Sequence, residues 1–136
     1  MLIEMPDGPA MGELGRGAQR RVLVCDDDRH VVRLIEVCLQ RHGHEVVKAY
    51  NGADALIRAM NQSFDLVLLD VMMPVLDGFE VLRALRTNPD TTYLPVVILT
   101  AKSSDRDVFT GYQSGADLYF TKPFSPDELL HLPFLR

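Results

Sequence analysis

Short apolar runs that end at polar side chains alternate with amphipathic stretches along most of this chain. Residues 22–25, 46–47, 66–69, 96–99 and 118–120 have the length and apolar character of strands. The run at 66–69 is continuously apolar, which is typical of a parallel strand covered on both faces. Between these runs, apolar residues recur at helical spacing in 31–39, 53–60, 79–85 and 104–114, and we expect these faces, which include Leu34, Ile57, Met60 and Phe109, to pack inward. This alternation of strand and helix predicts an α/β fold.

We predict a doubly wound, five-stranded parallel sheet in the flavodoxin-like strand order 2-1-3-4-5. The last helix should begin with Ser125 as its N-cap and Pro126 at its first position. It should be short, because Pro133 follows closely and a proline inside a helix costs about 3 kcal/mol or more. We expect the shortened helix to leave part of one sheet face exposed.

Length and composition limit the classes of protein that are possible. A chain of 136 residues fits one domain, and its formal net charge of -5 argues against a nucleic-acid-binding surface. No apolar run approaches the length of a membrane span and no signal peptide is visible, so we expect a cytoplasmic protein that does not bind membranes. Residues 1–19, rich in Gly and Pro, are expected to be a flexible leader, and residues 20–136 the folded domain.

Acidic side chains stand where two of the predicted strands end. Asp26 and Asp27 follow the first strand, and Asp70 follows the continuously apolar one. Because the carboxyl ends of parallel strands meet at one edge of the sheet, these carboxylates should lie close together. They would repel each other unless a cation is present, and Mg2+ favours such oxygen ligands. A solvated loop, a helix cap, or compensation by water, Na+ or Lys remain alternatives.

Three further residues follow or belong to the last two strands. Lys122 could form a structural salt bridge with the acids, or it could stabilise the oxygen of a transferred phosphoryl group. Thr100 could cap the next helix or contribute its hydroxyl to the same crevice. The alternation around Tyr119 fits either a core or a surface position. Three acids, one hydroxyl and one ammonium together suit Mg2+ and a phosphoryl group.

Five motifs of this chain resemble those of a known family, the receiver domain of bacterial two-component response regulators. The resemblance is to the chemotaxis-regulator-like form of this domain. The five motifs are residues 22–28, residues 65–78, the pair Thr100-Ala101, residues 115–117 and the triplet Lys122-Pro123-Phe124. The motifs occur in order and at family-like spacing, and the resemblance covers residues 21 to about 130.

The resemblance implies that Asp70 is the phosphoacceptor, which takes its phosphoryl group from a phosphohistidine of a sensor histidine kinase or phosphotransfer protein. Asp27, Asp70 and the backbone carbonyl of Met72 would bind Mg2+ directly, and Asp26 would act largely through water. The ion would offset negative charge during the transfer.

The resemblance also implies a switch. Thr100 would hydrogen-bond the phosphoryl group and Lys122 would pair with it, the peptide bond to Pro123 being commonly cis in the family. Movement of Thr100 would be coupled to Tyr119, so that phosphorylation would change a surface used for partner binding, formed by the fourth helix, fifth strand and fifth helix. Met72 and Lys102 occupy the positions that tune dephosphorylation. Neither is the acid or amide that best orients an attacking water, so we expect a long-lived phosphoryl group.

Partners and competing functions complete the interpretation. We expect a kinase or phosphotransfer partner, an unknown downstream protein target, no direct nucleic-acid contact, and a possible homodimer with a weakened surface. The chain could be a fragment of a longer regulator or hybrid kinase. The alternatives are a Mg2+-dependent phosphohydrolase of the haloacid-dehalogenase-like kind, with Asp70 as nucleophile, and a pseudo-receiver that works without phosphorylation. The hydrolase would usually have an acid where this chain has Met72.

Overall fold

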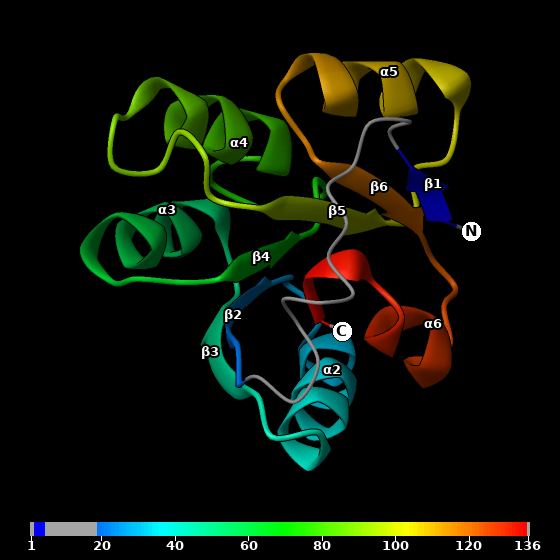
Figure 1. The fold of residues 1–136 in the computed structure, drawn as a ribbon. Coiled ribbons are helices and arrows are strands. Elements are labelled where there is room, and N and C mark those ends of the chain that lie inside the picture. The colour runs from blue at the N-terminus through cyan, green and yellow to red at the C-terminus, as the bar shows by residue number, and fades with distance from the viewer. Residues whose placement is uncertain (1, 5–18, 136) are drawn as a thin grey trace.

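The computed structural model describes residues 2–4 and 19–135, and their strands form one sheet in the order β1-β6-β5-β4-β2-β3 (Figure 1). The strands from β2 onward pair in parallel. They are β2 (Arg21–Cys25), β3 (Glu45–Ala49), β4 (Leu66–Leu69), β5 (Val96–Thr100) and β6 (Leu118–Thr121). Numbered along the chain, these five strands have the order 2-1-3-4-5, which confirms the predicted flavodoxin-like topology.

One strand was not predicted. Strand β1 (Leu2–Glu4) pairs antiparallel with β6, with Ile3 opposite Tyr119. It lies within the segment 1–19 that was expected to be a flexible leader. Most of that segment lies outside the described residues, so its flexibility stays a prediction. A strand of three residues is too short for a periodic pattern to reveal it.

Helices cover both faces of the sheet, as a doubly wound fold requires (Figure 1). The elements are α2 (Arg29–Arg41), α3 (Gly52–Asn61), α4 (Gly78–Thr87), α5 (Asp105–Gln113), α6 (Pro126–Leu130) and the 3-10 helix η1 (Pro133–Leu135). One core joins α3, α4 and α5 to the sheet through side chains such as Leu23 and Leu69. The other joins α2, α6 and η1 through Val24 and Leu68. Alternate residues of the central strands therefore enter opposite cores.

Polar side chains fix where the helices begin. Asp28 accepts hydrogen bonds from the backbone N–H groups of His30 and Val31 and so caps α2. Ser125 caps α6 in the same way, and Pro126 takes the first helical position, as predicted. Gly43 follows α2 with a φ of 86°, the left-handed conformation that favours glycine.

The C-terminal region confirms one expectation and corrects another. Helix α6 is short, and Pro133 begins η1 instead of continuing it. The sheet face that we expected to be exposed is covered, since Phe120 of β6 is only 1% exposed. Leu132 and Leu135 pack into the core beside Leu129 and replace the missing helical turns. The proline redirects the chain but does not remove its apolar side chains from the sheet.

The apolar faces assigned to some helices were wrong. In α3, Ile57 and Met60 were expected to pack inward, yet they are 61% and 40% exposed. Ala55 and Ala59 are buried instead, because small side chains let a helix lie close to its neighbours. Leu34 of α2 and Phe109 of α5 are likewise exposed. Among the described residues, no helix is both long and apolar enough to cross a membrane.

Candidate functional site

The polar residues that follow the strands meet at the carboxyl edge of the sheet. Asp26 and Asp70 directly follow β2 and β4, whose last residues Cys25 and Leu69 are register partners. The backbone N–H of Asp70 donates to the carbonyl of Cys25 over 2.9 Å, which extends this pairing. Thr100 ends β5, and Lys122 follows β6. The topology therefore brings these four residues together, as the sequence predicted.

Three carboxylates form a compact cluster at this edge. One oxygen each of Asp26, Asp27 and Asp70 lie within 4.8 Å of one another. Asp26 and Asp70 are buried, whereas Asp27 is exposed to solvent. The pKa of Asp26 is raised to about 6, chiefly by burial and also by the nearby Asp70 carboxylate, although hydrogen bonds from Lys122 and the backbone of Asp28 lower it. The cluster carries negative charge that needs compensation.

Lys122 supplies part of that compensation. Its Nζ lies 2.6 Å from Oδ2 of Asp26 and 2.9 Å from Oδ2 of Asp70. Burial disfavours the charged ammonium, but the hydrogen bonds to both carboxylates outweigh burial, so the pKa of Lys122 lies above its ordinary value. Lys122 therefore stays positively charged between the two acids. Its peptide bond to Pro123 is cis, as the resemblance implied.

Hydrogen bonds also fix the orientation of the Asp70 carboxylate. Its Oδ1 accepts one from the Thr100 hydroxyl over 2.7 Å and one from the backbone N–H of Met72 over 2.8 Å. Thr100 is fully buried, so its hydroxyl belongs to the crevice and does not cap α5, where Ser104 is the N-cap. Asp70 thus faces a hydroxyl on one oxygen and an ammonium on the other.

Two glycines hold the loop behind Asp70 in place, and only the structure reveals this role. A Cβ on Gly78 would lie 2.4 Å from the backbone oxygen of Asp70. A Cβ on Gly52 would lie 1.7 Å from the backbone oxygen of Leu76 in the same loop. Both positions therefore require glycine for close approach. The sequence shows a turn at Gly52 and a helix start at Gly78. It does not show that the backbone of another segment lies against each glycine.

Tyr119 occupies an inward, fully buried position and links β6 to the segment after Thr100. Its hydroxyl donates to the carbonyl oxygen of Lys102 over 2.7 Å, and burial raises the pKa of Tyr119 to about 12. This resolves the core or surface alternative in favour of the core. The side chains of Lys102 and Met72 are exposed beside the site, Met72 by 52%.

The donor atoms of the carboxylate cluster fit a hard metal ion. Asp26, Asp27 and Asp70 offer only oxygen, with no sulfur or imidazole nitrogen in the cluster. Oxygen ligands suit Mg2+, Ca2+ and Mn2+ better than softer metals. The exposed Asp27 leaves access from solvent. The triad can therefore hold a metal ion, although its geometry does not select one ion.

Carboxylates, a hydroxyl and an ammonium therefore stand together at the carboxyl edge of a doubly wound sheet, which is where ligands bind in folds of this kind. The sequence model of the response regulator receiver domain matches residues 22–132, and the chain belongs to this family. A receiver domain is a phosphoacceptor that works with a histidine kinase and is not a turnover enzyme.

Individual relatives agree with this assignment. The chain is 43% identical over 110 residues to the alkaline phosphatase synthesis transcriptional regulatory protein PhoP of Bacillus subtilis, covering 81% of this chain and 45% of the relative. It is 38% identical over 112 residues to the transcriptional regulatory protein ResD of the same organism, covering 82% and 45%. The chain therefore spans about half the length of the curated relatives it matches.

Solved structures show the same fold. The chemotaxis response regulator CheY4 of Vibrio cholerae has a TM-score of 0.79 at 34% identity, covering 83% of this chain and 94% of that one. The receiver domain of the Francisella response regulator 1452 has a TM-score of 0.77 at 38% identity, covering 82% and 91%. The likeness supports the chemotaxis-regulator-like form of the receiver fold.

Proposed function

We propose that Asp70 accepts a phosphoryl group from the phosphohistidine of a sensor histidine kinase or a phosphotransfer protein. The observation that carries the proposal is the environment of the Asp70 carboxylate. Thr100 hydrogen-bonds one of its oxygens, Lys122 binds the other, and Asp26 and Asp27 stand beside it. This arrangement has the positive charge and the donors that a phosphoryl group needs.

In the proposed transfer, a carboxylate oxygen of Asp70 attacks phosphorus. A bond between oxygen and phosphorus forms as the bond between phosphorus and the imidazole nitrogen breaks, and the nitrogen keeps the electron pair. The Lys122 ammonium, now 2.9 Å from the Asp70 carboxylate, would pair with a phosphoryl oxygen. The Thr100 hydroxyl would donate a hydrogen bond to another. Position and charge, with no further covalent chemistry, are the protein's contribution.

We propose Mg2+ as the ion that assists this transfer. Asp27, Asp70 and the backbone carbonyl of Met72 would hold it directly, and Asp26 would contribute largely through water. When bound, the ion offsets negative charge on the carboxylates and the phosphoryl oxygens. The all-oxygen donor set supports this choice. A related response regulator, Rcp1, has been solved in an Mn(2+)-bound form at 28% identity and a TM-score of 0.73.

Phosphorylation would act on partners through Thr100 and Tyr119. Thr100 would move toward the phosphoryl group, and Tyr119, now buried with its hydroxyl on the Lys102 carbonyl, would change its population between inward and outward positions. The affected surface is formed by α5, β6 and α6. It would bind a downstream protein target or a second copy of the chain. We expect no direct nucleic-acid contact, and we propose that the protein works in the cytoplasm.

Met72 and Lys102 would set how long the phosphoryl group lasts. Both side chains are exposed beside the site, and neither is an acid or an amide that orients an attacking water. The phosphorylated form should therefore be long-lived for the family. Rapid loss of phosphate from the purified, phosphorylated protein in the presence of Mg2+ would contradict this.

Intact-mass measurement after incubation with Mg2+ and acetyl phosphate tests the proposed function. The native chain should gain one phosphoryl group, and the gain should disappear in Asp70→Asn and when Mg2+ is removed by chelation. Asp65→Asn is a matched control, because it removes an exposed carboxylate from the opposite end of β4. An unmodified native chain with a normal thermal melt would support a module that works without phosphorylation.

A further inference from the structure

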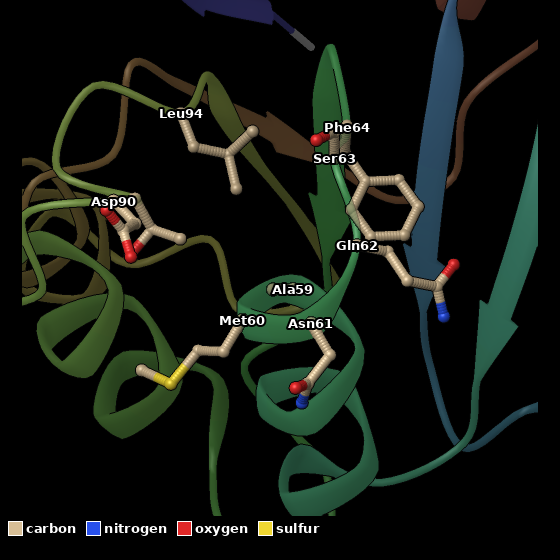
Figure 2. A pocket seen from close by; sticks show the side chains of 9 residues that line it. Ala59, Met60, Asn61, Gln62, Ser63, Phe64, Asp90 and Leu94 are labelled. Atoms are coloured by element: carbon tan, nitrogen blue, oxygen red, sulfur yellow. The ribbon is translucent and has the colours of Figure 1, made fainter.

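A second surface lies at the amino edge of the sheet, at the opposite end of β4 and β5 from Asp70. It surrounds a hollow of about 310 Å³ between the end of α3 and the loop that joins α4 to β5 (Figure 2). Apolar side chains from both sides line this hollow, including Met60 of α3, Phe64 before β4 and Leu94 before β5. We call residues 57–64 with 90–94 the amino-edge surface.

The two formally charged residues of this surface are Arg58 and Asp90. The carboxylate of Asp90 lines the hollow and, within residues 2–4 and 19–135, has no hydrogen-bond donor or basic partner. Helices α3 and α4 both end here, and helix C-termini carry partial negative charge. The basic residues of their last turns are already engaged, since Arg58 pairs with Asp54 and Arg86 with Asp117. Arg21 is engaged as well, since it lies over the ring of Phe64 and donates to Gln62 and Ser63. Among the described residues, Asp90 is therefore the unpaired charge at the hollow, and it favours a cation.

The loop that forms one wall is held firmly. Arg86 donates from Nη1 to the carbonyl oxygens of Thr92 and Leu94, over 3.1 and 2.7 Å. The Thr91 hydroxyl donates to the carbonyl of Leu85 over 2.7 Å. On this fixed loop Tyr93 is 94% exposed. An aromatic ring presented on a rigid loop loses little conformational freedom when it binds, which favours affinity.

The opposite wall presents apolar side chains as well. Ile57 and Met60 are three residues apart on α3, so they share one face, and they are 61% and 40% exposed. Met60 lines the hollow itself, and on the other wall Tyr93 directly precedes the lining residue Leu94. Contiguous exposed apolar groups mark interaction sites, and Tyr and Met are enriched in protein interfaces. These apolar side chains do not pack in the core of the domain, so core packing does not explain why they are apolar.

We propose that the amino-edge surface docks a segment of a partner protein in which Lys or Arg lies beside apolar residues. The hollow is at the lower limit of the ~300–1,000 Å³ typical of small-molecule sites, so it suits one long side chain. The aliphatic stem of Lys or Arg would lie on Met60 and Leu94, with its cationic head at Asp90. The net charge of -5 on the chain favours approach of a basic segment.

Docking here is independent of phosphorylation, because the surface shares no residue with the Asp70 site and lies at the other end of the strands. A partner could remain bound while the state of Asp70 changes. The docking proposal can therefore be wrong while the proposed phosphoacceptor function is right, and the reverse also holds.

A peptide-display selection tests the docking proposal. The full chain is immobilised and screened against random short peptides, and the most enriched peptide is synthesised and titrated by fluorescence anisotropy. We expect peptides that combine Lys or Arg with apolar residues. Asp90→Asn and Tyr93→Ser should each weaken binding at least about fivefold, which corresponds to a loss above about 1 kcal/mol. Both side chains are exposed, so both variants should melt like the native chain.

Two controls make the result specific. Phe109→Ser removes another exposed aromatic ring, on α5, and should leave the affinity unchanged. Asp70→Asn should also leave it unchanged, whatever it does to phosphorylation. Three outcomes would overturn the proposal. They are enrichment of acidic peptides, a failure to enrich any peptide, and binding to Asp90→Asn or Tyr93→Ser that is as tight as binding to the native chain. Concentration-dependent self-association that Tyr93→Ser abolishes would also overturn it, since a second copy would then occupy the surface.

Discussion

Replacement of Lys122 by Met should destabilise the metal-free protein and increase its response to metal. The Nζ of Lys122 lies within 3 Å of carboxylate oxygens of both Asp26 and Asp70, at 2.6 and 2.9 Å. Met has a similar length and an apolar end, so the main change is the loss of the positive charge. Two buried carboxylates would then face each other without their cation.

The size of the effect follows from burial. Removing one partner of a buried ion pair costs about 3–5 kcal/mol. The Lys122 side chain is 18% exposed, against 4% and 7% for Asp26 and Asp70, so water screens part of the interaction and the lower end applies. We expect a loss of about 3 kcal/mol. For a chain of 136 residues this lowers the melting temperature by about 10 °C.

Thermal unfolding with and without Mg2+ measures both effects. A metal that binds only the folded state at a hundred times its Kd adds about 2.7 kcal/mol. Because the ammonium no longer competes with the ion, the gain should be larger in Lys122→Met than in the native chain. Lys48→Met is the matched control, since Lys48 pairs with Glu36 away from the site and is 39% exposed. The reasoning would be refuted if, without metal, Lys122→Met were as stable as the native chain. It would also be refuted if Mg2+ stabilised Lys122→Met no more than it stabilises the native chain.

Three further substitutions test other parts of the account. Glu36 is buried, and hydrogen bonds from Arg33 and Lys48 hold its pKa below the ordinary value. Its stabilisation is therefore complete above the ordinary pKa of about 4.3 and is lost as pH falls through the lower folded pKa. Glu36→Gln should cost about 1–2 kcal/mol in urea unfolding at neutral pH, with the difference disappearing in acid; a difference independent of pH would contradict this. Gly78→Ala should cost about 1–3 kcal/mol and slow phosphorylation by acetyl phosphate, because its Cβ would meet backbone at the end of β4; an unchanged labelling rate would show that the loop can yield. Leu132→Ala should cost about 2–5 kcal/mol in denaturant unfolding, whereas a loss below about 1 kcal/mol would mean that the segment after α6 does not complete the core.

The topology could be predicted because its signals are local and repeated. Continuously apolar strands such as Leu66–Leu69 indicate burial on both faces, and the helix cap at Ser125 lies where the sequence placed it. The site followed from topology alone, since Asp26 and Asp70 must meet once their strands are neighbours. Residues far apart in the sequence thus became predictable neighbours.

Packing between helices was less predictable. Ile57 and Met60 fit an apolar helical face as well as Ala55 and Ala59 do, and only close packing in the structure selects the alanines. The same limit applies to Gly78, because the backbone that excludes a Cβ belongs to another element. The covered sheet face near Phe120 was missed because a proline predicts where a helix ends, but it does not predict where the following chain packs.

The central claim is that Asp70 carries the phosphoryl group. The most direct test is to incubate the native chain with Mg2+ and acetyl phosphate, reduce the acyl phosphate with sodium borohydride, and locate the modified residue by peptide mass spectrometry. The account predicts that Asp70 is converted to homoserine, and that the conversion requires both Mg2+ and acetyl phosphate. Conversion at another aspartate, or at none in a folded and Mg2+-loaded protein, would contradict it.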